Sequence, residues 1–159
     1  MIGVGARPAQ RVLRDTHGTP FAVGGVMPRP MCLVFLPFAF SPVCHREVGG
    51  LSDRFPAFSD AGVDLVFVTC DPLFSLKAWA EQNRFSGVFL SDFWPHGDLS
   101  RAFGVFDETD GFAHRGSFLL DGTGVVRWST RVGRGESRDL DTHLDALDVV
   151  RPGSATFLP

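Results

Sequence analysis

The apolar positions along the chain follow the periods of both strands and helices. Met31 to Leu36 is apolar at every position, which is typical of a central strand that is covered on both faces. Val63 to Thr69 predicts a second buried strand, and Val88 to Leu90 predicts a short third one. Between them, Pro72 to Asn83 predicts a helix that is opened by proline. This alternation of strand and helix favours an α/β fold.

Turn signals predict two β-hairpins at either end of this pattern. Near the N-terminus, Arg11 to Arg14 and Phe21 to Val23 flank a turn-rich segment. Further along, Ser117 to Leu120 and Val125 to Thr130 flank an Asp-Gly-Thr-Gly turn. An amphipathic helix is expected over Leu140 to Val149. The tail beyond it, 151–159, is expected to be loosely held.

A further helix is predicted directly after the central strand. Pro37 ends the strand because it cannot donate to the ladder, and Ser41 is a candidate N-cap followed by proline at the first helical position. The helix is expected to end near Pro56, and the pair Gly49-Gly50 weakens its middle by about 1 kcal/mol per glycine relative to alanine. The apolar side chains that it would turn inward are Val43, Val48, Leu51 and Phe55.

Composition and charge narrow the range of functions. The 159 residues fit a single domain, 1–159, with 44% hydrophobic residues to build its core. The net charge of -3 and the lack of a Lys/Arg-rich run argue against nucleic acid as a partner. The longest apolar stretch is far shorter than the roughly 20 residues that cross a bilayer, which argues against a membrane partner. No segment has the pattern of a secretory signal, so we expect a cytoplasmic protein.

The residues Pro37, Ser41 and Cys44 read Pro-x-x-x-Ser-x-x-Cys between the buried strand and the first turn of the helix. A cysteine at a helix N-terminus faces unpaired amides and the positive end of the helix dipole, which favours the thiolate. Attack on a peroxide also needs donors around the sulfur, and the Ser41 hydroxyl and the Cys44 amide are candidates. Pro37 would shield the thiolate from water, and an arginine from elsewhere would hold the sulfur anionic.

The segment from Phe35 to Glu47 resembles the active-site loop of the peroxiredoxins. The segments Leu90 to Gly97 and His114 to Asp121 look like the downstream blocks of the one-cysteine, AhpE-like class of that family. The resemblance implies a thioredoxin-like fold, with a central mixed β-sheet flanked by helices and an N-terminal β-hairpin. It also implies site roles, with Cys44 as the peroxidatic cysteine, Ser41 in the place usually held by threonine, Arg115 as the arginine that completes the site, and Glu47 as the acidic residue that orients the loop.

The same resemblance implies a thiol-dependent peroxidase that reduces hydrogen peroxide, organic hydroperoxides and peroxynitrite. Cys44 would become a sulfenic acid, which an external thiol reduces. That thiol would be a low-molecular-weight thiol acting with a glutaredoxin-like protein, or thioredoxin. A homodimer is expected, and the chemistry needs no cofactor, neither metal nor flavin. The shape of the pocket around Phe38, Phe40 and the loop of Trp94 would select the peroxide.

The other two cysteines leave one alternative mechanism open. Cys32 lies inside the apolar strand and is expected to be a core residue. Cys70 ends the second strand, at the sheet edge where α/β sites gather, and is expected to be structural. The alternative is a two-cysteine peroxidase in which Cys70 resolves oxidised Cys44. One subclass places its resolving cysteine at position 49, but that position is Gly49 in this sequence, so Cys70 is the candidate that remains.

Other functions remain as alternatives to the peroxidase. A non-enzymatic thioredoxin-fold sensor or relay would pass the oxidation of Cys44 to a partner, and a structural or chaperone-like oligomer is also compatible with the fold. The absence of a Cys-x-x-Cys motif disfavours a thiol-disulfide oxidoreductase, and a copper chaperone would need a second sulfur near Cys44. The five histidines show no spacing typical of a metal site. A charged run is predicted to form a solvated face, and its members are Arg131, Arg134, Glu136, Arg138 and Asp139.

Overall fold

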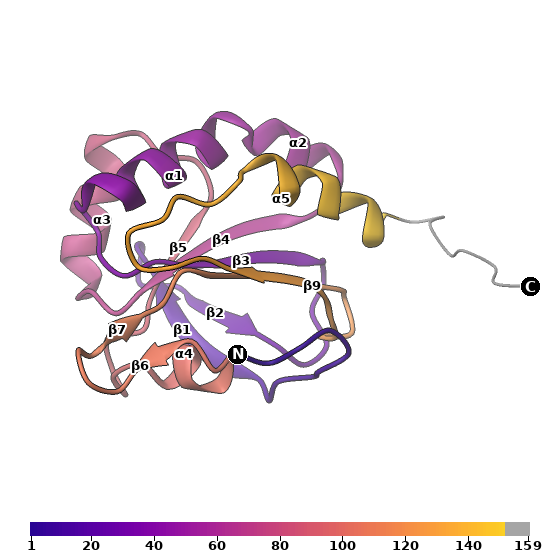
Figure 1. Cartoon of the computed structure of the whole chain (residues 1–159), viewed down its shortest axis with the longest axis horizontal. Helices are drawn as coiled ribbons and strands as arrows, with labels where there is room; N and C mark the ends of the chain where they lie inside the picture. The colour runs from indigo at the N-terminus through magenta and orange to yellow at the C-terminus, as the bar shows by residue number, and fades with distance from the viewer. Residues whose placement is uncertain (152–159) are drawn as a thin grey trace, which may run out of the picture.

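Within residues 1–151, which the computed structural model describes, seven strands form one sheet in the order β2-β1-β5-β4-β3-β8-β9 (Figure 1). The three central strands β5, β4 and β3 run parallel to one another, and all the other pairs are antiparallel. The sheet is therefore mixed, as predicted. Its strands are β1 (Arg11–Asp15), β2 (Pro20–Val23), β3 (Met31–Phe35), β4 (Asp64–Thr69), β5 (Val88–Ser91), β8 (Gly116–Leu120) and β9 (Val126–Arg131).

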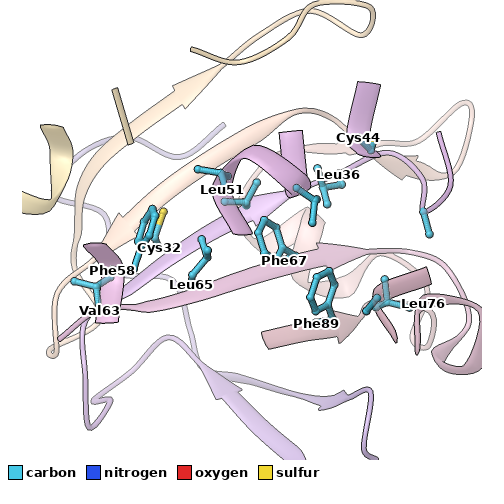
Figure 2. Close-up of a cluster of buried hydrophobic side chains, with 14 of the residues drawn as sticks. Cys32, Leu36, Cys44, Leu51, Phe58, Val63, Leu65, Phe67, Leu76 and Phe89 are labelled. Atoms are coloured by element: carbon cyan, nitrogen blue, oxygen red, sulfur yellow. The ribbon is translucent and has the colours of Figure 1, made fainter. Parts of the chain in front are cut away.

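The central strand β3 explains how the core is divided between the two faces of the sheet. Successive side chains of a strand point to opposite faces, and all five residues of β3 are buried. Cys32 and Val34 join the core cluster on one face, and Leu33 and Phe35 join the cluster on the other. Burial on both faces of the sheet therefore explains the uninterrupted apolar run, as predicted. Cys32 is confirmed as a core residue (Figure 2).

Helices cover the two faces unequally (Figure 1). One face carries α1 (Pro42–Asp53), α2 (Phe55–Asp60), α3 (Leu73–Gln82) and α5 (Asp141–Ala146), which contribute Leu51, Phe58, Trp79 and Ala146 to its core. The other face carries the short helix α4 (Asp98–Ala102), whose Leu99 is fully buried. None of the helices within residues 1–151 is long and apolar enough to cross a membrane.

Two predicted helix boundaries are wrong. The helix that begins after Ser41 ends at Asp53, and a second helix, α2, starts at Phe55. Pro56 therefore opens a helix instead of closing one, because proline is tolerated in the first turn, where its missing N–H has no partner to lose. The C-terminal helix is also shorter than predicted, since α5 passes into the 3-10 turn η1 (Leu147–Val149). The predicted tail, 151–159, falls outside the described residues except for Arg151.

Three small elements were not predicted, namely α4 and the hairpin formed by β6 (Phe106–Asp107) and β7 (Phe112–Ala113). Buried Asp92 holds this region together. Its carboxylate accepts hydrogen bonds from the backbone N–H of Leu99 at 3.0 Å and from the N–H and hydroxyl of Ser100 at 2.8 and 2.7 Å. The carboxylate thereby anchors the start of α4 to the end of β5, on the sheet edge that leads into the hairpin.

Candidate active site

The loop from β3 to α1 places a cysteine in the first turn of a helix. Phe40 adopts a left-handed backbone with φ 65°, an uncommon conformation for a bulky side chain, and so turns the chain into the helix. Ser41 is the N-cap, with extended φ and ψ, and its Oγ accepts a hydrogen bond from the Cys44 N–H at 3.4 Å. The predicted cap is thus confirmed. The Cys44 amide already has a partner, whereas the Ser41 hydroxyl proton stays available for donation.

Cys44 is fully buried and shares one helix face with Glu47, Val48 and Leu51. Val43 and Phe55, which were predicted to point inward as well, are only partly buried. A carboxylate in this stripe is unusual, because an ionised group that is buried needs compensating charge and hydrogen bonds. The Glu47 side chain is 2% exposed.

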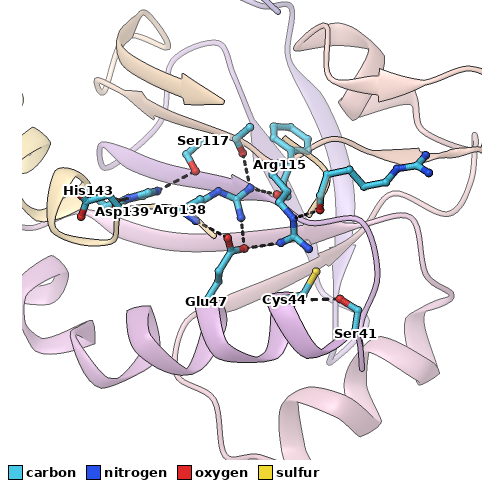
Figure 3. Close-up of polar contacts among 11 residues, drawn as sticks. Ser41, Cys44, Glu47, Arg115, Ser117, Arg138, Asp139 and His143 are labelled. Atoms are coloured by element: carbon cyan, nitrogen blue, oxygen red, sulfur yellow. Dashed lines mark hydrogen bonds and ion pairs between the residues drawn. The ribbon is translucent and has the colours of Figure 1, made fainter. Parts of the chain in front are cut away.

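Two buried arginines satisfy Glu47 (Figure 3). Arg115 Nη1 donates to Oε2 at 2.7 Å. Arg138 donates twice, from its backbone N–H to Oε1 at 2.8 Å and from Nη1 to Oε2 at 2.5 Å. The side chains of Arg115 and Arg138 are 4% and 0% exposed. Charge-assisted bonds of this geometry are the strong ones in proteins, so Glu47 fixes both guanidinium groups.

Backbone carbonyls hold the rest of each arginine. Arg115 Nε donates to the carbonyl of Arg134 at 2.9 Å. Arg138 Nη2 donates to the carbonyls of Phe35 and, at 3.3 Å, Gly116. Burial lowers the pKa of Arg138 from its usual value, and Glu47 opposes that effect. An arginine stays charged even so, and the cluster therefore holds two cations against one carboxylate.

Cys44 lies next to this cluster, which has one more positive than negative charge. In Figure 3 its sulfur points up toward the Arg115 guanidinium, from the helix that also carries Glu47. As a thiolate, Cys44 would give the two buried cations a second anion. Opposite charges in a site that excludes water attract much more strongly than in bulk water, so an anion at the sulfur would balance the net positive charge of the cluster.

A pocket of about 240 Å³ opens beside this cluster. The Phe38 and Phe112 rings meet at 4.9 Å between centroids, and the Arg134 guanidinium lies 4.6 Å over the Phe112 ring. Arg134 is also paired with Asp107 at 3.4 Å and with Asp110. The residues that line the pocket are Pro37, Phe38, Ser41, Phe112, Arg115 and Arg134.

The structure brings together five of the six residues singled out from the sequence. Pro37, Ser41 and Arg115 line one pocket, and Cys44 and Glu47 lie beside it. Cys70 does not line this pocket: its sulfur lies near Asp92, against the Ser100 hydroxyl and the backbone N–H of Ala113, which donates to it. Burial and the charge of Asp92 raise the pKa of Cys70 to about 12, and burial raises that of Cys32 to about 12 as well. Both are poor nucleophiles at neutral pH.

The prediction of a solvated face from Arg131 to Asp139 is wrong at one residue. Arg131, Arg134, Glu136 and Asp139 are exposed. Arg138 is buried, with 5% of the whole residue exposed, and it lies in the cluster. No local pattern marks Arg138, because its partner Glu47 is 91 residues away. The available signal was Glu47 itself, since a carboxylate on the buried face of a helix needs compensating charge and hydrogen bonds from elsewhere in the chain.

Metal binding finds no support in the described part of the chain. Within it, no group of three or more His, Cys, Asp and Glu side chains is arranged to hold a metal ion.

Solved structures with the same fold are peroxiredoxins. Peroxidoxin BcpB from Mycobacterium tuberculosis superposes with a TM-score of 0.85 at 26% identity, over 96% of this chain and 100% of that one. A peroxiredoxin-like protein from Aquifex aeolicus shares the fold with a TM-score of 0.83 at 22% identity, over 94% of this chain and 88% of that one. The fold is thus the thioredoxin-like fold of the peroxiredoxin class, as the resemblance implied.

Sequence comparison narrows the class to a family. The model of the AhpC/TSA family matches residues 5–129. Alkyl hydroperoxide reductase E of Mycobacterium tuberculosis is 37% identical over 148 residues, which cover 92% of this chain and 97% of that protein. Peroxiredoxin TSA2 of Saccharomyces cerevisiae is 37% identical over 105 residues, or 62% of this chain and 53% of that protein. The chain therefore belongs to the AhpC/TSA family of peroxiredoxins, and it is a thiol-dependent peroxidase.

Proposed function

We propose that Cys44 is the peroxidatic thiol and that the pocket beside it receives the peroxide. The observation that carries this proposal is the buried charge cluster, in which two arginines contact Glu47 and the Cys44 sulfur points toward the Arg115 guanidinium. A thiolate at that point is stabilised by the cluster and by the amino end of α1. The fold supplies this environment to neither Cys32 nor Cys70.

In the proposed reaction, the Cys44 thiolate attacks the terminal oxygen of the peroxide. A sulfur–oxygen bond forms and the O–O bond breaks, so that the sulfur is oxidised by two electrons and the peroxide is reduced by two. The sulfur keeps the terminal oxygen with its hydrogen as the sulfenic acid, and the departing oxygen takes from solvent the proton that the thiol gave up on ionisation and leaves as water or an alcohol; from peroxynitrite the leaving group is nitrite. Arg115 and the Ser41 hydroxyl donate to the peroxide oxygens while charge develops on them. Pro37, buried at the pocket wall, shields the sulfur from water.

Glu47 and Arg138 act as positioning residues in this scheme. Glu47 accepts from both arginines and so fixes the Arg115 donors against the sulfur. Arg138 ties Glu47 to the end of β3 and the start of β8 through the carbonyls of Phe35 and Gly116. Preorganised donors of this kind need no rearrangement during the reaction, which is the source of their catalytic effect.

We further propose that an external thiol completes the cycle. One thiol displaces the sulfenic oxygen as water and forms a mixed disulfide with Cys44, and a second thiol releases the Cys44 thiolate. A low-molecular-weight thiol with a glutaredoxin-like protein, or thioredoxin, fits this role. Resolution by Cys70 is disfavoured by its burial, its hydrogen bonds and its raised pKa.

The proposed substrates are hydrogen peroxide, organic hydroperoxides and peroxynitrite. The name of the relative, alkyl hydroperoxide reductase E, supports the organic class. The apolar rings of Phe38 and Phe112 at the pocket also suit a substrate with a hydrocarbon part. Three unpaired thiols suit a reducing compartment, and we place the protein in the cytoplasm.

A homodimer is proposed from the family resemblance. Phe74 and Trp94 are 80% and 83% exposed, and a second copy of the chain would cover such apolar area.

The proposed nucleophile is tested by peroxide consumption with dithiothreitol as reductant. The Cys44→Ser variant is expected to lose turnover, because a hydroxyl at this position does not ionise at neutral pH. Cys70→Ser is the matched control, since its hydroxyl can keep the contacts to Ser100 and Ala113, and it should turn over like the wild type. Loss of turnover in Cys70→Ser with activity left in Cys44→Ser would overturn the assignment.

Replacement of Arg115 tests the proposed transition-state donor. Arg115→Gln should lower the second-order rate constant for oxidation of Cys44 about tenfold to a thousandfold, the range seen when one preorganised donor is lost. Arg127→Gln is the control, because this arginine pairs with Asp121 on the exposed side of β9. Stopped-flow measurement of the reduced proteins gives both rate constants. Equal rate constants would remove Arg115 from the mechanism.

A further inference from the structure

His143 is a buried histidine outside the pocket that the mechanism does not use. It lies in α5, and it is 1% exposed. Its ring is enclosed by contacts from three directions. Nε2 is 2.9 Å from the Ser117 hydroxyl, Nδ1 is 3.2 Å from the carbonyl of Asp139, and the Trp128 ring packs edge-on at 5.0 Å between centroids.

These contacts define one form of the ring. A carbonyl oxygen can only accept, so Nδ1 carries the hydrogen and donates to Asp139, and Nε2 accepts from the Ser117 hydroxyl. Burial and the nearby Arg138 charge lower the pKa of His143 to about 4. The neutral ring, which makes both hydrogen bonds, is therefore the form present at neutral pH.

The two contacts of His143 reach the two segments that carry the active-site arginines. Asp139 directly follows Arg138, and Ser117 is two residues beyond Arg115 on β8. In Figure 3 the imidazole, Asp139 and Ser117 lie on the side of Arg138 that faces away from Cys44. On that side the ring bridges the loop of Arg138 and β8, the strand that directly follows Arg115.

Arg138 needs such an anchor. The preceding residues 133–137 are exposed and two of them are glycines, and the stretch is tied to the rest of the chain through Arg134, four residues before Arg138. Among the described residues, Arg138 Nε is a buried donor with no hydrogen-bond partner. The guanidinium is therefore oriented through Nη1 and Nη2 alone, and the Arg138 backbone is held on one side by its N–H bond to Glu47 and on the other by the contact of Asp139 with His143.

We propose that His143 is a positioning residue of the active site, which acts through Arg138 by fastening the Arg138 segment onto β8, the strand that directly follows Arg115. The inference rests on the proposed roles of Arg115 and Arg138. A displaced Arg138 would let Glu47 move, and Arg115 would then lose its alignment with the sulfur. Misplacement of about 1 Å can slow a reaction by up to about a hundredfold.

The test compares two replacements at position 143. His143→Phe fills the ring volume but makes neither hydrogen bond, and His143→Gln offers an amide oxygen to Ser117. The rate constant for oxidation of Cys44 by hydrogen peroxide is expected to fall at least about tenfold in the first variant and to recover in the second. Ser117→Ala, which removes the hydroxyl that donates to Nε2, should slow oxidation in the same direction.

Two further measurements separate positioning from general stability. Ser100→Ala removes another fully buried hydroxyl, which donates to Asp92 at 2.7 Å, and it should lower Tm without slowing oxidation. In an Arg138→Lys background, His143→Phe should cost much less in rate than in the wild type, because residues that act through one another are not additive. The rate constant for oxidation of Cys44 in the wild type tests the proposed function. The ratio of the variant rate constants to the wild-type one tests the role of His143. Rate constants unchanged in both His143→Phe and Ser117→Ala, or equal losses in both backgrounds, would overturn the proposal.

Discussion

Glu47 is the residue on which the charge cluster depends. It is the carboxylate between two buried guanidinium groups, and it accepts one hydrogen bond from each of them and a third from the backbone N–H of Arg138. Without its charge, Arg115 and Arg138 would repel each other in a site that water does not screen. A buried ion pair adds little to stability compared with an apolar pair, but removal of one partner is costly because an unpaired charge is left behind.

Glu47→Gln is therefore expected to lower the free energy of unfolding by about 3–5 kcal/mol and to slow oxidation of Cys44. Urea denaturation and stopped-flow oxidation measure the two effects. Glu81→Gln is the control, since Glu81 is exposed and pairs with Lys77 at 3.8 Å, and surface pairs of this kind contribute less than about 1 kcal/mol. A Glu47→Gln variant as stable and as fast as Glu81→Gln would show that the cluster is not held by this carboxylate.

For single residues of the site, the sequence predicted those close to Cys44 in the chain and missed Arg138, which is far from it. Pro37, Ser41 and Glu47 stand at short, fixed spacings from the cysteine, and Arg115 falls in a segment that resembles a family block. Arg138 follows an exposed, glycine-containing stretch, and the pairing with Glu47 arises only when the loop folds back over β3 and β8. Spacing along the chain holds no information about such a contact.

The helix α1 shows how an element is adapted to its neighbour. Two adjacent glycines in its middle lower the intrinsic stability of the helix, as the sequence predicted. They have different surroundings, however. A Cβ at position 50 would collide with the Leu140 side chain, whereas at position 49 the nearest atom, in the Phe85 ring, would be 3.7 Å away. Gly50 therefore permits the segment before α5 to pack on α1, one turn beyond Glu47.

Alanine at these two positions should act in opposite directions. Gly49→Ala is expected to stabilise the protein by about 0.5–1 kcal/mol, since alanine is the better helix former and has space. Gly50→Ala is expected to destabilise it despite the same gain in propensity, because Leu140 must move. Chemical denaturation of the two variants gives the comparison. Equal stabilisation by both would mean that the contact with Leu140 does not constrain α1.

Elements with a strong periodic signal were predicted, and those made by tertiary contacts were not. β3 and β4 are apolar because helices or loops cover both sides of them, and their boundaries are within one residue of the prediction. The strands β6 and β7 have two residues each and pair only with each other, and α4 is five residues long. Elements this short have no period to recognise, and α4 depends on Asp92 seven residues from Leu99.

The acid response of the whole molecule follows from His143. Its pKa falls from 6.5 to about 4 on folding, because burial disfavours the charged ring and Arg138 repels it, while Asp139 attracts it weakly. Between these two values the unfolded chain binds more protons than the folded one. This contribution to stability is therefore complete above about pH 6.5 and is lost as the pH falls toward 4.

Acidification from pH 7 to pH 4 should lower the stability of the wild type relative to His143→Gln by about 3 kcal/mol, from the size of this shift. Glutamine does not titrate, so the difference between the two proteins isolates the histidine from the carboxyl groups that also titrate in this range. Urea denaturation at several pH values measures it. A difference that stays constant from pH 7 to pH 4 would contradict a buried neutral ring.

At the scale of the molecule, the active site is assembled from three stretches of chain that the sheet brings together. The loop after β3 and the first turn of α1 supply Pro37, Ser41 and Cys44, the residue before β8 is Arg115, and the loop after β9 supplies Arg138. Adjacent pairing of β3, β8 and β9 explains why segments so far apart in sequence meet. The peroxidase assignment thus depends on the topology as much as on the cysteine motif.

The most direct test of this account is to trap the oxidised cysteine. The reduced protein receives one equivalent of hydrogen peroxide with dimedone present, and intact and peptide mass spectrometry locate the adduct. The account predicts a fast reaction that gives a single dimedone adduct on Cys44, with Cys32 and Cys70 unmodified. A disulfide between Cys44 and Cys70 would contradict the one-cysteine cycle, and slow modification of all three thiols would contradict the central claim that the buried charge cluster activates Cys44.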